Sequence, residues 1–474
     1  MEKVLMNSVG QFFKAQPKVV PSLDPTFQPG SLSTREFKRC LRASAASPVP
    51  VNVALEQADG STFHFHTEMF PENSEHAGYN FAHLERWIKF LLWSRGACRI
   101  YFKGPESLAK RLQDHFHDQP TGQFDADLMG RRVYERPFEV VRISSEALPP
   151  AREATRPLGR HLEGYRIGFD LGASDRKAAA VVNGEVVFSE EVPWDPVKQT
   201  DPQWHYDQLM AMLKSAASHM PRVDAIGGSA AGVYVNNRVQ VASLFRGVPA
   251  NLFDSRVKTI FWELKKAWNN VPFEVVNDGE VTALAGAMSL NANSVLGVAL
   301  GSSQAAGYVT GEGNITSWLN ELAFAPVDYR HDAPVDEWSG DYGCGVQYFS
   351  QQCVGRLLKP AGIEVDPQMP LPEKLKHVQK LMESDDSRAA AIYHTIGVYL
   401  GYGVAHYADF YDIRNVLLLG RVTTGPGGSI ILEQAQTVLK TEFPDLANRI
   451  AFHTPSERDK RHGQAIAAAS LPVL

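Results

Sequence analysis

The sequence has 474 residues, of which 44% are hydrophobic and 21% are charged, a composition typical of a globular protein with several domains. Lys and Arg number 47 against 53 Asp and Glu, so the formal charge is −6 and offers no long-range attraction to nucleic acid or anionic lipid. The apolar runs are shorter than the roughly 18 residues that a membrane-spanning helix needs. We therefore expect neither a nucleic-acid partner nor a membrane.

The segment Met1–Gly10 lacks the apolar stretch and the small-residue cleavage pattern of a signal peptide, which predicts a cytoplasmic protein. Cys40, Cys98, Cys344 and Cys353 form no CxxC pair. Four cysteines are too few to stabilise a chain of this length by disulfide bonds, and we expect free thiols in a reducing compartment.

The first third of the chain divides into two parts at about residue 50. Residues 1–50 are rich in Pro and Ser and predict an extended arm with one short helix at Thr34–Ala43. Residues 51–160 predict a small accessory α/β domain that ends in a linker, Leu148–Arg160. This part is nearly neutral and shows no helix-turn-helix pattern, so we expect it to contribute to substrate access or dimer contacts rather than to DNA binding.

Periodicity predicts the elements of this accessory domain. They are a β-hairpin over Val51–Gln57 and Ser61–Phe70, a helix over Phe81–Ser94, a strand at Arg99–Lys103, a helix that Pro105 opens, and one or two strands within Val133–Ile143. His64 and His66 alternate with Phe and form a possible HxH metal pair, but one face of a half-exposed strand explains them equally simply.

A candidate phosphate turn follows the apolar run Tyr165–Phe169. Asp170 to Lys177 forms a turn that contains Gly172 and Ser174, and a second strand begins at Ala178. Backbone N–H groups beside Gly172, the Ser174 hydroxyl and the Lys177 charge suit phosphate oxygens, and Asp170 suits hydrated Mg²⁺. An ordinary hairpin carries such residues too, so this motif is weak by itself.

A second turn of the same kind follows the apolar strand Val295–Leu300. It contains Gly301, Ser302 and Ser303, and a further strand continues to Val309. Two strand–turn–strand units with hydroxyl-rich turns are what a protein with one phosphate turn in each half would need.

Asn277 and Asp278 stand between these motifs, where the strand Phe273–Val276 ends and a helix begins. Both residue types are good helix N-caps, worth about 1 kcal/mol, and capping alone would explain them. A carboxylate at the end of a strand that faces a cleft is also where a general base for a substrate hydroxyl would lie.

The order of these motifs from about residue 165 to 474 resembles the ROK (repressor, open reading frame, kinase) family of sugar kinases. Ile226–Val233 is similar to its Gly-rich substrate-side strand, and Asn277–Asp278 to the pair that holds the catalytic base. Asn320–Asp328 is similar to its Gly-Glu-Ile-Gly-His segment, and Asn415–Val422 to the turn at the adenosine pocket. His462–Ala469 resembles the closing helix.

The resemblance implies an α/β fold of the two-lobed, actin-like ATPase type, a duplicated ribonuclease H-like unit, with the accessory α/β domain added at the N-terminus. The N-terminal lobe would comprise residues 161–290 and the C-terminal lobe residues 291–474. A homodimer is expected from the same resemblance.

The sequence departs from the family pattern at positions that would bind zinc, substrate and nucleotide. Phe324 stands where the family has a His that touches both sugar and zinc, and only Cys344 remains of the zinc cysteines. A structural zinc ion needs four ligands, so we predict no zinc site. At the adenosine turn Arg421 replaces the second glycine. The Asn with which the family contacts the sugar is also missing, and Ser243 or Arg246 would have to take its place.

The family resemblance also implies the roles of the site residues. Asp278 would be the general base, with Asn277, Glu321 and Ser229 on the acceptor, in a transfer of the γ-phosphoryl group of ATP to a hydroxyl of a sugar or polyol. Asp170 would hold Mg²⁺ through water. The remaining nucleotide contacts would come from Gly172, Ser174, Lys177, Gly301, Ser302, Ser303, Gly420, Gly427 and Gly428.

Two other functions remain open at this point. The family includes repressors, so a non-catalytic sugar sensor or regulator of the same fold is the main alternative. An ATPase of this fold that acts as a conformational switch on a protein partner is the other, and it would show no stimulation of ATP turnover by an acceptor.

Overall fold

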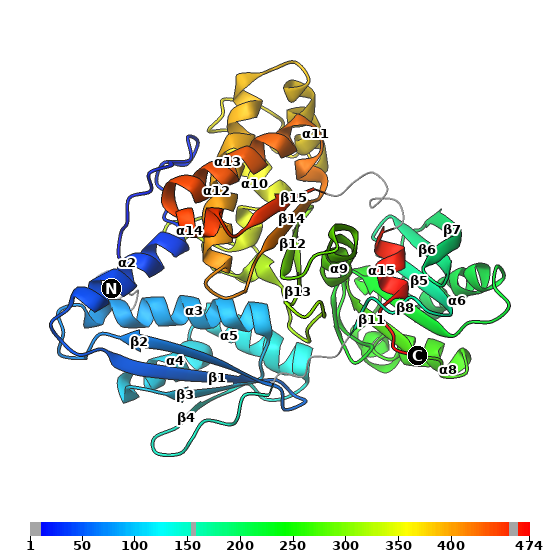
Figure 1. The fold of residues 1–474 in the computed structure, drawn as a ribbon, viewed down its shortest axis with the longest axis horizontal. Coiled ribbons are helices and arrows are strands. Elements are labelled where there is room, and N and C mark those ends of the chain that lie inside the picture. Colours follow the sequence, from blue (N-terminus) through cyan, green and yellow to red (C-terminus); the bar gives the residue numbers. More distant parts are fainter. Residues whose placement is uncertain (1–10, 153–157, 455–462) are drawn as a thin grey trace.

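The computed structural model describes residues 11–152, 158–454 and 463–474. Three larger β-sheets with α-helices around them organise the chain (Figure 1). One sheet belongs to the N-terminal part, one to the green region between residues 165 and 277, and one to the C-terminal part. In the described part of the chain, no helix has both the length and the apolar character needed to cross a membrane.

The N-terminal sheet has four strands in the order β2-β1-β3-β4. Its strands are β1 (Val49–Glu56), β2 (Thr62–Met69), β3 (Arg99–Lys103) and β4 (Glu139–Arg142). Antiparallel pairing of β1 with β2 confirms the expected hairpin. The expected helix is α3 (Asn80–Arg95), which lies between this sheet and the C-terminal part (Figure 1) and is buried along nearly its whole length.

Two local expectations in this region need correction. Pro105 is the N-cap residue of α4 (Glu106–Asp118) and not its first helical residue. Of the segment Val133–Ile143 only β4 is a strand, because a π-helical segment, Asp127–Tyr134, follows α5 (Pro120–Ala126) and includes Val133. A continuous apolar face on this segment is equally compatible with helix, and periodicity in so short a run does not separate the two.

The second sheet has five strands in the order β11-β8-β5-β6-β7. They are β5 (Tyr165–Leu171), β6 (Asp175–Val182), β7 (Glu185–Pro193), β8 (Ala225–Ala230) and β11 (Phe273–Asn277). β5, β6 and β7 form an antiparallel meander, and β8 and β11 continue the sheet in parallel on the other side of β5. Helices α6 (Pro202–Ala217) and α8 (Ile260–Ala267) pack on it through one apolar cluster.

The third sheet has the order β13-β12-β14-β15. It consists of β12 (Val295–Leu300), β13 (Gln304–Val309), β14 (Asn415–Leu419) and β15 (Ala451–His453). β12 pairs antiparallel with β13 on one side and parallel with β14 on the other, and this is also how β5 pairs with β6 and β8. The two sheets therefore repeat one arrangement around a central strand.

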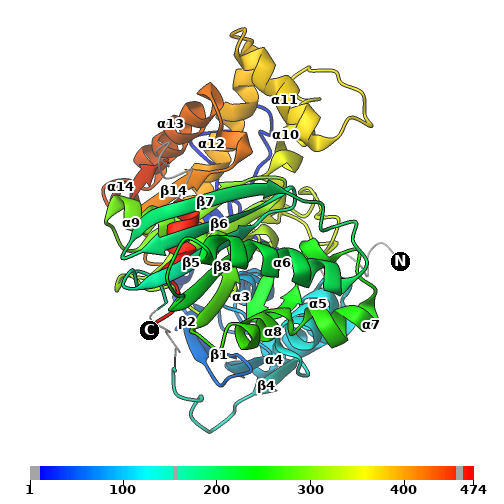
Figure 2. The same cartoon turned by 90° about the vertical axis from the view of Figure 1, so that its right-hand side faces the viewer.

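Helices cover the third sheet and join the parts of the chain (Figure 2). These helices are α9 (Asp278–Leu290), α10 (Gln351–Leu357), α11 (Leu371–Met382), α12 (Ser387–Tyr407) and α13 (Pro426–Glu442). The remaining elements are α2 (Gly30–Ala43), α7 (Ala250–Leu252), α14 (Pro444–Ala447), α15 (Gln464–Ala469), β9 (Val233–Val235) and β10 (Arg238–Val241).

The N-terminal sheet and the third sheet share a single hydrophobic core. One cluster of buried side chains runs from Phe27 and α3 through β12 to α12 and α13. Within it, the ring of Phe27 in the N-terminal arm packs edge-on against Tyr399 of α12, with centroids 4.7 Å apart. The N-terminal part thus has its own sheet but not a separate core.

The last helix, α15, corrects our placement of the whole segment 291–474 in one lobe. It packs on β5 and β8 of the second sheet, so the chain returns to the N-terminal lobe at its end (Figure 1). The approach is close, since a Cβ atom on Gly168 or Gly227 would lie within 2 Å of a backbone oxygen of α15. His462, at the start of the expected closing helix, lies outside the described residues.

Candidate active site

The first candidate phosphate turn is shorter than expected. Asp170 belongs to β5 and Lys177 to β6, so the turn itself is Gly172–Ser174. The backbone N–H of Gly172 donates to the Asp175 oxygen at 3.0 Å, and the exposed Ser174 hydroxyl donates to the Asp175 carboxylate at 2.8 Å. Lys177 pairs across the strands with Asp170, and its ammonium lies 3.5 Å from the Asp175 carboxylate.

Asp170 lies at the base of this turn and is held by Ser229. The Ser229 hydroxyl, at the end of β8, donates to Oδ1 of Asp170 at 2.7 Å. Burial raises the pKa of Asp170, against the lowering effects of this hydrogen bond and of Lys177. The structure therefore uses Ser229 to orient Asp170, and a direct contact between Ser229 and a substrate stays a prediction.

The second turn, Gly301–Ser303, occupies the same place after β12. The Gly301 N–H donates to the Ser303 oxygen at 2.9 Å, and the Gln351 N–H donates to the Gly301 oxygen at 2.9 Å. The side chains of Ser302 and Ser303 are exposed. We call Gly172–Ser174 and Gly301–Ser303 the two serine turns; each follows the central strand of its sheet.

Asn277 caps α9, as the capping interpretation of this pair predicts. Its Oδ1 accepts the Gly279 N–H at 2.7 Å, and its Nδ2 donates to the Gly232 oxygen at 2.8 Å. Both ends of the amide are thus occupied inside the protein, and they fix the strand-to-helix junction at which Asp278 begins α9.

Asp278 interacts electrostatically with carboxylates from both lobes. Burial, together with the charge of Asp170, raises the pKa of Asp278 to about 6. Burial and the charge of Asp278 raise the pKa of Glu321 to about 7. Asp278 and Glu321 therefore titrate close to neutral pH, in the range where a carboxylate can accept a proton from a hydroxyl and release it again.

Glu280 is a fourth member of this group, and the sequence interpretation missed it. It is buried in the first turn of α9, and its Oε1 accepts a hydrogen bond from the Asn320 side chain. Burial raises its pKa to about 8 despite that hydrogen bond. We call Asp170, Asp278, Glu280 and Glu321 the carboxylate cluster. In the sequence Glu280 is an acidic residue in the first turn of a helix, an ordinary position for that residue type, so nothing there indicated its burial.

The glycines assigned to adenosine have explanations within the protein. Gly420 has φ of +100°, and a Cβ there would lie 2.4 Å from the Leu300 oxygen. A Cβ on Gly427 would lie 2.4 Å from the Tyr393 ring, and one on Gly428 would lie 2.1 Å from the Thr423 oxygen. Close packing therefore accounts for all three, that of Gly420 against Leu300 and that of Gly427 and Gly428 at the start of α13, and contact with a nucleotide stays a prediction.

The N-terminal part of the chain holds the segment that carries Glu321. At the end of α3, the Trp93 oxygen accepts the Glu321 N–H at 2.9 Å, and the Ser94 oxygen accepts the Asn320 N–H at 3.0 Å. Gln57, at the end of the first hairpin strand, donates to the Ser317 oxygen at 3.1 Å. The accessory sheet is thus a structural component of the site.

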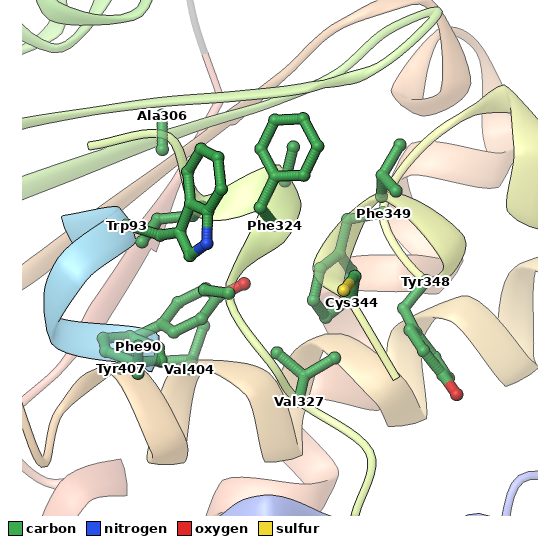
Figure 3. Packing of buried hydrophobic residues seen from close by; sticks show 14 of the residues in the cluster. Phe90, Trp93, Ala306, Phe324, Val327, Cys344, Tyr348, Phe349, Val404 and Tyr407 are labelled. Atoms are coloured by element: carbon green, nitrogen blue, oxygen red, sulfur yellow. The ribbon is translucent and has the colours of Figure 1, made fainter. Parts of the chain in front are cut away.

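An aromatic contact continues this attachment. The ring of Phe324 stacks on Trp93 with centroids 4.2 Å apart and planes 27° apart (Figure 3). Cys344 lies fully buried in the same apolar cluster. Burial and the nearby Asp341 raise the pKa of the Cys344 thiol well above its usual range, which keeps it protonated at neutral pH.

Buried ion pairs surround Asp341, close to Cys344 in the chain. Asp341 accepts from Arg86 and Lys89 of α3, each at 2.9 Å, and Lys89 also lies 2.9 Å from Asp125. Burial opposes the charge on Lys89, but the two carboxylates outweigh it and raise the pKa of the ammonium. Within residues 11–152, 158–454 and 463–474, no group of three or more His, Cys, Asp or Glu side chains is arranged to hold a metal ion.

Known proteins share this fold. A ROK hexokinase from Thermus thermophilus superimposes with a TM-score of 0.52 at 18% identity, covering 65% of this chain and 97% of the hexokinase. A ROK family transcriptional regulator, a homologue of the E. coli MLC protein, gives 0.53 at 16% identity, covering 65% of this chain and 79% of the regulator. No family model matches the sequence, and no curated protein matches it.

These similarities establish that the chain is an α/β protein with the fold shared by ROK sugar kinases and ROK regulators. The resemblance seen in the order of the motifs is therefore confirmed at the level of the fold. About a third of the chain lies outside the matched share, in keeping with an additional N-terminal part.

Proposed function

We propose that this protein is a divergent ROK-family kinase that transfers the γ-phosphoryl group of ATP to a hydroxyl group of a sugar or related polyol. The observation that carries the proposal is the pair Asp278 and Glu321, two carboxylates from different lobes whose pKa values rise to about 6 and about 7. A base of this kind beside a phosphate-binding turn is what phosphoryl transfer to a hydroxyl requires.

Asp278 accepts the proton of the attacking hydroxyl in this mechanism. Its position at the first residue of α9 is fixed by Asn277, whose amide is bound at both ends, so Asn277 is a positioning residue. Glu321 exists in both protonation states near neutral pH and can therefore donate to or accept from a second acceptor hydroxyl. General-base catalysis of this type contributes about 10² to 10⁴ in rate.

In this proposal the two serine turns bind the phosphate groups of the nucleotide. Their exposed hydroxyls and backbone N–H groups bind phosphate oxygens, and Lys177 adds a positive charge next to the first turn. Mg²⁺ usually binds through one or two carboxylates plus phosphates and water, and the single carboxylate of Asp170 fits that requirement. When bound, the ion would neutralise charge on the phosphates.

An acceptor-dependent assay tests this function. Purified protein is incubated with Mg²⁺ and ATP alone and with each member of a panel of hexoses, amino sugars and linear polyols, and ADP and phosphorylated product are measured. The proposal expects at least one acceptor to increase ADP formation and to yield an equal amount of phosphorylated product. Hydrolysis of ATP that no acceptor stimulates would instead support the ATPase alternative.

A sugar-responsive regulator is the second candidate, because a ROK regulator shares the fold as well as a ROK hexokinase does. The replacement of the family His by Phe324, packed against Trp93, also favours it. Tight binding of a sugar without any phosphoryl transfer, under conditions where the Mg²⁺–ATP analogue binds, would support the regulator over the kinase.

A further inference from the structure

A cavity of about 330 Å³ lies where the N-terminal hairpin meets the two lobes. The residues that line it come from the hairpin turn Gln57–Asp59 together with Tyr134, and from the segment Gly232–Asn237. The end of β11, Glu280 of α9 and the segment Thr316–Leu319 also line it. This volume falls within the range of small-molecule sites, roughly 300 to 1,000 Å³.

Glu280 is a buried polar group that lines this cavity and lacks a full set of partners. Its side chain is 4% exposed, and Oε1 accepts from Asn320. Oε2 has no hydrogen-bond partner among the described residues. Oε2 itself is shielded from solvent, and a backbone hydrogen bond from Tyr308 also acts on this carboxylate, so Glu280 contributes a buried acidic residue beneath the cavity surface.

The charge of the walls restricts the ligand. Asp59, Glu274 and Glu280 line the cavity, and among the described residues that line it there is no Lys or Arg. Because burial raises the pKa of Glu280 to about 8, this carboxyl group is mostly protonated at neutral pH and can donate to a hydroxyl or carbonyl oxygen. Phosphate and carboxylate groups would meet acidic walls without a cationic partner.

Apolar and aromatic surface completes the cavity. Trp318, Tyr134 and Tyr234 contribute rings, and Leu158, Val233 and Leu319 contribute aliphatic surface. Trp318 is held in place by two neighbours. It stacks on Tyr308 at a centroid distance of 5.5 Å, and the Arg95 guanidinium lies over the Trp318 ring, 3.6 Å from its centroid. Flat apolar walls with a few polar groups suit a compact ring with hydroxyl groups.

The cavity is lined by direct chain neighbours of the proposed catalytic pair, although Asp278 and Glu321 are not themselves among its lining residues. Asn277, which lines it, directly precedes Asp278, and Thr316–Leu319 leads through Asn320 to Glu321. We propose that this cavity holds the body of the acceptor, that the acceptor is an uncharged or cationic polyhydroxylated molecule, and that the turn of the N-terminal hairpin selects it. The identification of the ligand as the phosphoryl acceptor rests on the proposed function, whereas binding of a ligand in this cavity can be tested separately.

Titration calorimetry with defined probes tests the assignment. The probes are glucose, N-acetylglucosamine, glucosamine, glucuronate and glucose 6-phosphate, and the proteins are wild type, Ala58→Trp and Glu68→Trp. Ala58 lines the cavity, so a Trp there fills it, whereas Glu68 is exposed on the neighbouring strand of the same hairpin and serves as the control. Thermal unfolding and binding of an Mg²⁺–ATP analogue verify that each variant is folded.

We expect at least one uncharged or cationic probe to bind wild type and Glu68→Trp equally, and to bind Ala58→Trp at least tenfold more weakly. The two anionic probes should bind more weakly than glucose. Tighter binding of an anionic probe, unchanged binding to Ala58→Trp, or no binding of any uncharged or cationic probe would overturn the inference.

The same variants separate this inference from the proposed function. If a probe binds, Ala58→Trp abolishes its binding and no phosphate is transferred, the cavity is a binding site but the kinase proposal fails. If wild type and Ala58→Trp phosphorylate the same acceptor with equal kcat/KM, the kinase proposal stands and the assignment of the cavity fails.

Discussion

The two serine turns and the carboxylate cluster illustrate two ways of building a site. Each serine turn is local: it joins adjacent strands, is closed by its own backbone, and leaves its hydroxyls exposed. The carboxylate cluster is assembled from β5, α9 and the segment before Phe324. Glu280 is buried and the other three members are half-buried, and the segment with Glu321 is held by hydrogen bonds to carbonyl oxygens at the end of α3. Substitutions in the serine turns should therefore affect nucleotide binding alone. Substitutions of the residues that hold the carboxylate cluster in place should also affect folding.

The largest expected effect is on stability, at Lys89. This ammonium is buried with Asp125 and Asp341, so Lys89→Met leaves carboxylates without a compensating charge and should lower the free energy of unfolding by about 3 to 5 kcal/mol. Urea denaturation measures the change.

Lys110→Met provides the matched control. Lys110 forms an exposed ion pair with Asp114 one helical turn away, and such pairs contribute about 0.3 to 0.5 kcal/mol. If Lys89→Met were no more destabilising than Lys110→Met, the ion pairs between α3 and Asp341 would not be what attaches the N-terminal part to the site.

The next effect concerns pH. A base acts when deprotonated, and the pKa of Asp278 is raised to about 6, so kcat/KM for phosphoryl transfer should be on a plateau above that pH and fall below it. At pH 5 the loss should be roughly tenfold, because about nine tenths of the group is then protonated. A profile that stayed flat down to pH 4.5 would show that no group with a raised pKa acts as the base.

An effect on nucleotide binding alone is expected in a serine turn. Ser302→Ala removes one hydroxyl that we assign to a phosphate oxygen, and a hydrogen bond to a charged group is worth about 1.5 to 3 kcal/mol, so KM for ATP should rise roughly tenfold or more. Stability should stay within about 0.5 kcal/mol of wild type because Ser302 is exposed. Ser384→Ala, at an exposed position after α11, should change neither quantity.

The sequence predicted well those features that short segments determine. Alternation in residues 51–70 specified the hairpin, the apolar run ending at Leu300 specified β12 and its turn, and Asn277 was recognised as a cap. Each of these depends on neighbours within a few residues, where backbone preference and side-chain periodicity act directly.

What the sequence did not predict are contacts between distant segments. Nothing near Trp93 indicates that its carbonyl accepts the N–H of Glu321, and nothing near α15 indicates that it packs on β5. Glu280 resembled an ordinary helix residue because its burial results from Asn320 and the segment around it. These features arise from tertiary packing, which the periodicity of one chain does not encode.

The most direct test of the account is the substitution Asp278→Asn, assayed with the cognate acceptor. Asn is as good as Asp at a helix start, and Asn277 still caps α9, so the protein should fold normally. We predict that kcat falls by about 10² to 10⁴ while the affinity for ATP barely changes, since the phosphate contacts come from the serine turns. Full phosphoryl transfer by Asp278→Asn would contradict the central claim that this carboxylate removes the hydroxyl proton.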